Sequence, residues 1–213
     1  MKQPGEMEGP PTGPSAVAVE VYDRVLERFG EPDLRIDSGT GAESSTIVSV
    51  FAWYPTTEVP LTTFATIGMC DVPIHGANHR VELHFARAGD LADNEIEAVG
   101  QFLIHLAGWT ARRSVLLDWW HLLPGIDTIP TYPGCHAMLM HPAFSHGGWD
   151  RLEVEIEDPG SEERPTEVRM LNIVPLTDTE AEEIRTEGLR PTMERLYALE
   201  SGMFAPRPTK PSS

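Results

Sequence analysis

Four stretches of the chain carry apolar residues at the spacing of an amphipathic helix. The first covers residues 15–30, with Ser15 as its N-cap, and the second covers about residues 93–108. The third, 177–187, opens with a Thr-x-x-Glu capping box, and the fourth has Pro191 in its first turn. The inward positions of the first, second and fourth helices are predicted to be Val17, Val21, Val25 and Phe29, then Ile96, Val99, Leu103, Leu106 and Ala107, and finally Met193, Leu196 and Tyr197.

Alternating apolar and polar positions predict the first strands. Residues 45–54 and 61–67 lie on either side of a proline-containing break, a pattern typical of a β-hairpin. A third strand is predicted around residues 80–85, with one apolar face and one face in water. The predicted wet face comprises Arg80, Glu82 and His84.

The second half of the chain predicts three more strands and a long loop. Residues 136–140 form one strand, and residues 152–156 form another whose outer face carries only glutamates. Residues 168–174 are apolar on both faces, which indicates a central strand that ends at Pro175. Between residues 114 and 132, glycines and prolines predict an irregular loop with aromatic content.

Together these elements predict an α/β chain of the mixed α+β class, with one central, mostly antiparallel or mixed β-sheet flanked by helices. Residues 15–204 are expected to form a single domain. Residues 1–14 and 205–213 are rich in proline and poor in apolar side chains, and are therefore expected to be disordered tails.

The charge of the chain limits its partners. It carries 33 acidic and 16 basic residues, a net charge of −17, so nucleic acid is not an expected ligand. Residues 150–187 alone hold thirteen acids and four arginines, which would attract a basic toxin or effector protein. The same acidity also serves solubility. Neither a signal peptide nor a membrane-spanning run is recognisable, which predicts a cytoplasmic protein.

Residues suited to catalysis or metal binding are present, but in patterns that do not define a site. Two histidine groups were considered as metal ligands, and a thiol with a nearby imidazole as a hydrolase nucleophile. Glycine-rich phosphate-binding motifs are absent from the sequence. We expect no enzyme and no cofactor, and a small metal-dependent or Cys/His hydrolase is the alternative. Its candidate residues are Cys70, His75 and His79, and the group Cys135, His136, His141 and His146.

A protein-binding surface is the remaining prediction. Asp118, Trp119 and Trp120 combine a charge with two aromatic rings in the predicted loop, which is the composition of an interaction hot spot. The alternative is that both rings fill the core below the loop. The acidic strand contributes three further candidate contact residues, Glu153, Glu155 and Glu157.

Several sequence blocks together resemble one known family, the suppressor-of-fused domain. The resemblance runs in order through about residues 45–200, and Cys70 stands where members of that family usually have a serine. The blocks are Trp53-Tyr54-Pro55, Thr63-Phe64-Ala65-Thr66-Ile67-Gly68-Met69-Cys70-Asp71, Arg80-Val81-Glu82-Leu83, and Asn172 to Glu180 followed by Gly188-Leu189.

The resemblance implies a mixed α/β domain without known catalysis. Animal members bind and restrain a transcription factor, whereas bacterial single-domain members resemble immunity proteins that neutralise a toxin of the same cell. We therefore expect a bacterial-type, non-enzymatic protein-binding module, and specifically an immunity protein that uses an acidic surface. An intracellular adaptor is a further alternative, and the oligomeric state stays open.

Overall fold

The fold was analysed in a computed structural model of the 213-residue chain. It describes residues 15–38, 48–72, 77–113, 115–142, 151–154, 166–199 and 202–207, of which 151–154 and 166 are described by their backbone alone.

One mixed β-sheet organises the described part of the chain. Its strand order is β1-β2-β3-β4-β8-β6-β5, and β7 pairs with β8 beside this path. Every neighbouring pair is antiparallel except β4 with β8, which is parallel. This arrangement confirms the predicted mixed α+β class. The strands are β1 (Leu34–Asp37), β2 (Ser49–Trp53), β3 (Leu61–Ile67), β4 (His79–Ala88), β5 (Leu122–Pro124), β6 (Cys135–Pro142), β7 (Arg151–Val154) and β8 (Thr166–Thr177).

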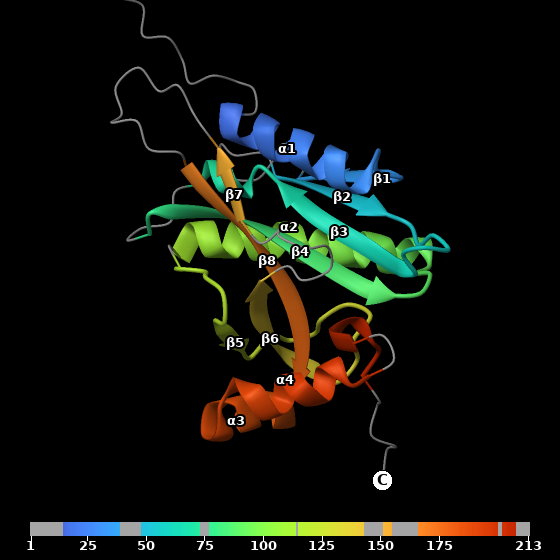
Figure 1. Ribbon diagram of the computed structural model, residues 1–213, viewed down its shortest axis with the longest axis vertical. Helices are drawn as coiled ribbons and strands as arrows, with labels where there is room; N and C mark the ends of the chain where they lie inside the picture. The colour runs from blue at the N-terminus through green and yellow to red at the C-terminus, as the bar shows by residue number, and fades with distance from the viewer. Residues whose placement is uncertain are drawn as a thin grey trace, which may run out of the picture.

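The helices cover both faces of this sheet and divide the core into three clusters. Helix α2 (Asp93–Arg113) packs on one face, and α1 (Ala16–Phe29) packs on the opposite face. Helices α3 (Asp178–Glu187) and α4 (Leu189–Tyr197) cover β6 and the C-terminal half of β8. Figure 1 shows α1 at one end of the molecule and α3 with α4 at the other. Short 3-10 turns, η1 (Met69–Asp71) and η2 (Gly202–Phe204), complete the fold.

Strand β8 joins the two parts of the molecule. Its residues 167–172 pair with β4, while residues 171–177 pair with β6 on the opposite edge. Figure 1 shows this long strand running from the α1 end to the α3 end. The strand continues through Pro175, which was predicted to end it. Proline is tolerated there because β8 has lost β4 as a neighbour, and one edge needs no ladder hydrogen bond.

Local sequence signals placed most helix boundaries correctly. Ser15 caps α1, its side chain accepting a hydrogen bond from the Ala18 N–H, and Gly30 follows the last turn. Thr177 and Glu180 form the predicted capping box of α3. Helix α2 runs past its predicted end at Gly108. Packing of Trp109 and Thr110 in the last turns offsets the roughly 1 kcal/mol that a glycine costs inside a helix.

Two strands differ from their prediction. Strand β1 was not predicted, since only Ile36 of its four residues is buried and its pattern carries little apolar signal. Strand β5 lies inside the segment predicted to be irregular, where Pro124 ends a pairing with β6 of only three residues. The predicted hairpin is confirmed as β2 and β3, and residues 45–47 lie outside the described residues.

The predicted wet face of β4 is wrong. Glu82 and His84 are buried, with side chains that are 0% and 2% exposed, and Arg80 is half-buried. The cause is α1, which covers this face of the sheet, where the Phe29 ring stacks on His84 with centroids 6.0 Å apart. The polar residues of this alternating strand therefore do not mark a solvent-exposed face.

The buried Glu82 side chain holds the turn after β3 through hydrogen bonds. Its Oε1 accepts hydrogen bonds from the N–H groups of Gly68 and Cys70 at 2.9 and 3.0 Å, and its Oε2 accepts one from the Thr66 hydroxyl at 2.5 Å. The turn in question is η1, whose Asp71 accepts hydrogen bonds from the hydroxyl and N–H of Ser15 at the start of α1. Glu82 thereby helps to fix α1.

The C-terminal residues 205–207, assigned above to a tail, pack against the sheet. Arg207 is 5% exposed and donates hydrogen bonds to the carbonyls of Ala205, Pro175 and Met203 at 2.9, 3.1 and 3.4 Å. Its guanidinium also lies 6.0 Å from the ring centroid of buried Tyr132. Residues 208–213 lie outside the described residues.

Glu82→Gln should remove a pH dependence of stability. Burial raises the pKa of Glu82 from 4.5 to about 7, so this residue's contribution is complete below pH 4.5 and is lost as pH rises through 7. The free energy of unfolding of the native chain should fall by about 3 kcal/mol across that window. Urea unfolding at several pH values measures it. Glu97→Gln on the exposed face of α2 is the control, and an identical pH slope in the Glu82 variant would refute the assignment.

Arg207→Ala should lower the free energy of unfolding by about 1–3 kcal/mol, because buried carbonyl groups lose their donor. Urea unfolding beside Arg190→Ala, an exposed arginine on α4, measures the difference. Equal stability of the two variants would show that Arg207 does not anchor the C-terminal segment.

Candidate functional site

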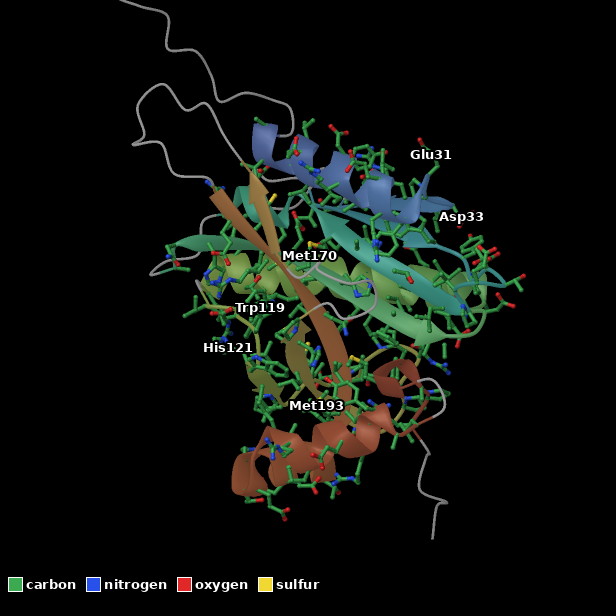
Figure 2. All side chains as sticks on the ribbon, viewed as in Figure 1. Glu31, Asp33, Trp119, His121, Met170 and Met193 are labelled. Carbon is green, nitrogen blue, oxygen red and sulfur yellow. The ribbon has the colours of Figure 1, made fainter. Side chains whose placement is uncertain are left out.

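The loop between α2 and β5 places the predicted aromatic residues in two different environments. Asp118 and Trp119 turn toward β8, whereas Trp120 turns outward and is 42% exposed. Figure 2 shows Trp119, with His121 beside it, between α2 and β5. Trp119 is partly buried against the core, and partner contact remains a prediction for both rings and for Asp118.

Asp118 and Trp119 are tied to β8 through Arg169. The Arg169 guanidinium donates to Asp118 at 2.5 Å and to Glu167 at 2.6 Å, and it lies 4.7 Å from the Trp119 ring centroid. The Trp119 indole N–H donates to the Met170 carbonyl at 3.3 Å. Burial opposes ionisation of Asp118, but the hydrogen bonds from Arg169 and the Trp119 N–H hold its pKa below the ordinary value. These two residues therefore act as supports of the loop.

Trp120 occupies a strained backbone conformation. Its φ is 69°, in the left-handed region that L-residues with large side chains rarely adopt. The strain is held by the hydrogen bond from the Trp120 N–H to the Met140 carbonyl at 2.5 Å, and by the next one, from the Met140 N–H to the His121 carbonyl at 2.9 Å. Strain of this kind concentrates at functional sites.

The Trp120 ring packs on His141, which lies between two exposed aromatic side chains. The Trp120 and His141 ring centroids are 4.6 Å apart in an edge-to-face arrangement. On the other side, the Tyr197 hydroxyl lies 2.9 Å from His141 Nε2. Burial lowers the pKa of His141 to about 4, so the ring is neutral at pH 7. Tyr197, predicted to face inward from α4, is 46% exposed, although its hydroxyl reaches His141 on β6.

His141 belongs to a row of buried polar residues across the middle of the sheet. His84, Asn172 and His141 are direct neighbours on β4, β8 and β6. His84 Nδ1 lies 2.8 Å from Asn172 Oδ1, and the Asn172 amide donates to Met203 Sδ at 3.3 Å. His84 Nε2 is buried and has no hydrogen-bond partner among the residues that the structure describes. The row lies where β8 passes from β4 to β6.

The predicted acidic contact residues are only partly placed. Glu153 lies on β7, where the register sets it opposite Glu167 on β8. Glu155 and Glu157 lie outside the described residues. All three remain predictions as contact residues.

The predicted metal ligands are separated where the structure describes them. His79 is buried at the start of β4, with Nε2 3.3 Å from the Leu117 carbonyl, and His136 pairs with Asp178 at 3.1 Å. Within the described residues, no three His, Cys, Asp or Glu side chains come together as metal ligands. His75 and His146 lie outside them.

Both thiols are buried and do not resemble activated nucleophiles. Burial, with the neighbouring Glu82 carboxyl, raises the pKa of Cys70, and burial raises that of Cys135 to about 11. A thiol that stays protonated at pH 7 is a weak nucleophile.

None of the described helices is both long and apolar enough to cross a membrane.

The strain at Trp120 gives an expected order of stability. Trp120→Gly and Trp120→Ala remove the same ring, but only glycine adopts φ near 69° without cost. The glycine variant should therefore be more stable than the alanine variant by about 1 kcal/mol in urea unfolding. At the similarly exposed Tyr54, whose φ is not positive, alanine should be at least as stable as glycine. The same order at both positions would contradict a strained Trp120.

Comparison with known proteins places the fold. The family model described as suppressor of fused protein (SUFU) matches residues 41–203. Among curated proteins, no sequence gives a significant match. A chain of the Sufu–Fu complex is similar to this one with a TM-score of 0.59 and 12% identity, over 86% of this chain and 83% of that chain.

Two further solved structures agree. Drosophila Suppressor of Fused matches with a TM-score of 0.61 and 12% identity, over 88% of this chain and 48% of that one, so this chain spans about half of its length. A SUFU homolog from Neisseria gonorrhoeae FA 1090 matches with a TM-score of 0.57 and 15% identity, over 84% and 87% of the two chains. With the family model covering most of its length and the shared fold, the chain belongs to the suppressor of fused family.

Proposed function

We propose that this domain is a non-enzymatic, cytoplasmic protein-binding module, and that it acts as an immunity protein by masking a basic toxin or effector of the same cell. Family membership supports the binding role, since a relative of the same fold was solved as the Sufu–Fu complex. Nucleic acid is not a proposed partner, because the net charge of −17 repels phosphate groups.

The observation that carries the proposal is the loop around Trp120. A large ring is held outward by a strained backbone, and a second exposed ring, Tyr197, packs on the same histidine, His141. Exposed aromatic side chains on a rigid base are enriched at the centres of protein interfaces. In this proposal Trp120 contacts the partner, while Asp118 and Trp119 hold the loop in place through Arg169.

The internal use of the reactive groups supports a role without catalysis. The Glu82 carboxylate is bonded to the backbone of a turn, and Cys70 is fully buried beside it. His84 and His141 are likewise buried. Groups so enclosed stabilise the fold but do not reach a substrate, and a catalytic base must come within hydrogen-bond distance of the proton it abstracts.

Acidity supports a basic partner. The excess of acids extends over the described helices: α1 carries Glu20, Asp23 and Glu27, and α3 carries Asp178, Glu180, Glu182, Glu183 and Glu187. Such a surface accelerates encounter with an oppositely charged protein and weakens in salt. Glu153, Glu155 and Glu157 are proposed to add to this attraction.

Co-purification tests the proposal directly. The tagged full chain is expressed in its native cell, and the bound protein is identified and assayed for toxicity with and without the chain. We expect a basic partner whose toxicity is suppressed, and whose affinity falls about tenfold or more between about 50 and 500 mM salt. An acidic partner, or suppression that persists when binding is lost, would contradict the proposal. So would substrate turnover that disappears in a folded Cys70→Ala variant.

A further inference from the structure

Four aromatic rings of the described residues have an arginine side chain over them, but Trp120 does not. An arginine lies over Phe51, Trp109 and Trp119, and two arginines lie over Tyr132, with guanidinium-to-centroid distances of 4.7–6.0 Å. Within the part of the chain that the structure describes, no arginine or lysine lies over Trp120, and its indole N–H makes no hydrogen bond. The most exposed tryptophan of the described residues thus has no internal cation over its ring.

The histidine beneath Trp120 does not supply that cation. His141 is fully buried and packs edge-to-face with the indole. Its pKa is lowered by burial, so it carries no charge at neutral pH. The electron-rich π-system of the indole therefore remains available to a positive group from outside.

Tyr197 extends the same surface. Its ring lies 6.2 Å from His141, centroid to centroid, and its hydroxyl lies within hydrogen-bond distance of His141 Nε2, which fixes the ring. Both exposed rings thus rest on one rigid residue of the central sheet. Two exposed apolar side chains flank them along the chain, Leu116 before Trp120 and Leu199 after Tyr197. We call Trp120 and Tyr197 the aromatic patch.

We infer that the aromatic patch receives an arginine side chain from the basic partner, with its guanidinium over the Trp120 ring. This inference rests on the proposed function and names its contact. Charge complementarity selects the occupant: the chain has a net charge of −17, and its own arginines stack on four other rings. A planar guanidinium stacks on aromatic faces more readily than an ammonium group does.

The strained backbone of Trp120 agrees with this role. A tryptophan with φ of 69° is strained where a glycine would not be, and among the described residues its ring packs on His141. In the free protein this arrangement has a cost. Stacking on a partner's guanidinium provides the interaction that offsets the cost, and the rigid loop reduces the entropy lost on binding.

Nuclear magnetic resonance on the full-length, nitrogen-15-labelled chain tests the contact. The probe is the peptide acetyl-Arg-Gly-Arg-Gly-Arg-amide, and its control has each arginine replaced by citrulline, which keeps the shape without the charge. We expect the indole resonance of Trp120 to shift saturably while those of Trp53 and Trp109 stay in place. The citrulline peptide should bind about two- to fivefold more weakly for each arginine that contacts a ring.

Matched variants make the test specific. Binding to the variants is followed at their backbone amide resonances, because Trp120→Ala and Trp120→Phe lack the indole. Trp120→Ala should abolish saturable binding, Trp120→Phe should retain weaker binding, and Tyr54→Ala, which removes an equally exposed ring, should leave binding unchanged. Circular dichroism and thermal unfolding confirm that each variant is folded. Equal binding of the arginine and citrulline peptides, shifts confined to other tryptophans, or no saturable shift would each overturn the inference.

The outcome is separable from that of the proposed function. A co-purified toxin that binds the Trp120→Ala variant as tightly as the native chain would refute the aromatic patch and leave the protein-binding role standing. Arginine-dependent binding at Trp120 without any toxic partner would support the patch and refute the immunity role.

Discussion

A single strand, β8, constrains the whole architecture. One of its edges pairs with β4 and the other with β7 and then β6, so the strand contributes side chains to all three core clusters. Each part of the sheet is incomplete without it. At its middle, Asn172 is paired with His84 on one side and His141 on the other. The polar row thus marks the place where α1 stops covering the sheet and α4 takes over.

The helices were predictable because their boundaries depend on chemistry within a few residues. Ser15, Thr177 and Gly188 act on backbone groups of their own helix, and the apolar spacing reports the packing face directly. Strand environments were less predictable. The alternation in β4 was interpreted as one dry and one wet face, but the cover comes from α1, more than fifty residues earlier in the chain. Glu82 has the sequence signature of an exposed residue and the surroundings of a core residue.

The candidate site shows the same division between local and distant information. An aromatic, charged loop could be recognised from Asp118, Trp119 and Trp120 alone. Which ring faces outward could not, because Trp119 is held by its hydrogen bond to the Met170 carbonyl, 51 positions away, and Trp120 is turned outward by the sign of its own φ. Tyr197 and His141 carried no sequence signal as a pair, since 56 residues separate them. Such a pair forms only when the sheet has placed β6 next to α4.

The position of α1 has a consequence for how the chain is made. The apolar face of this helix packs against Val168 and Met170 of β8, and its N-cap, Ser15, is hydrogen-bonded to Asp71. During synthesis the helix leaves the ribosome well before β8, which carries part of its packing surface. An amphipathic helix of this length is marginally stable alone in water. Its apolar stripe therefore stays without its final cover until β8 has been made, and contacts so distant in sequence make folding slow.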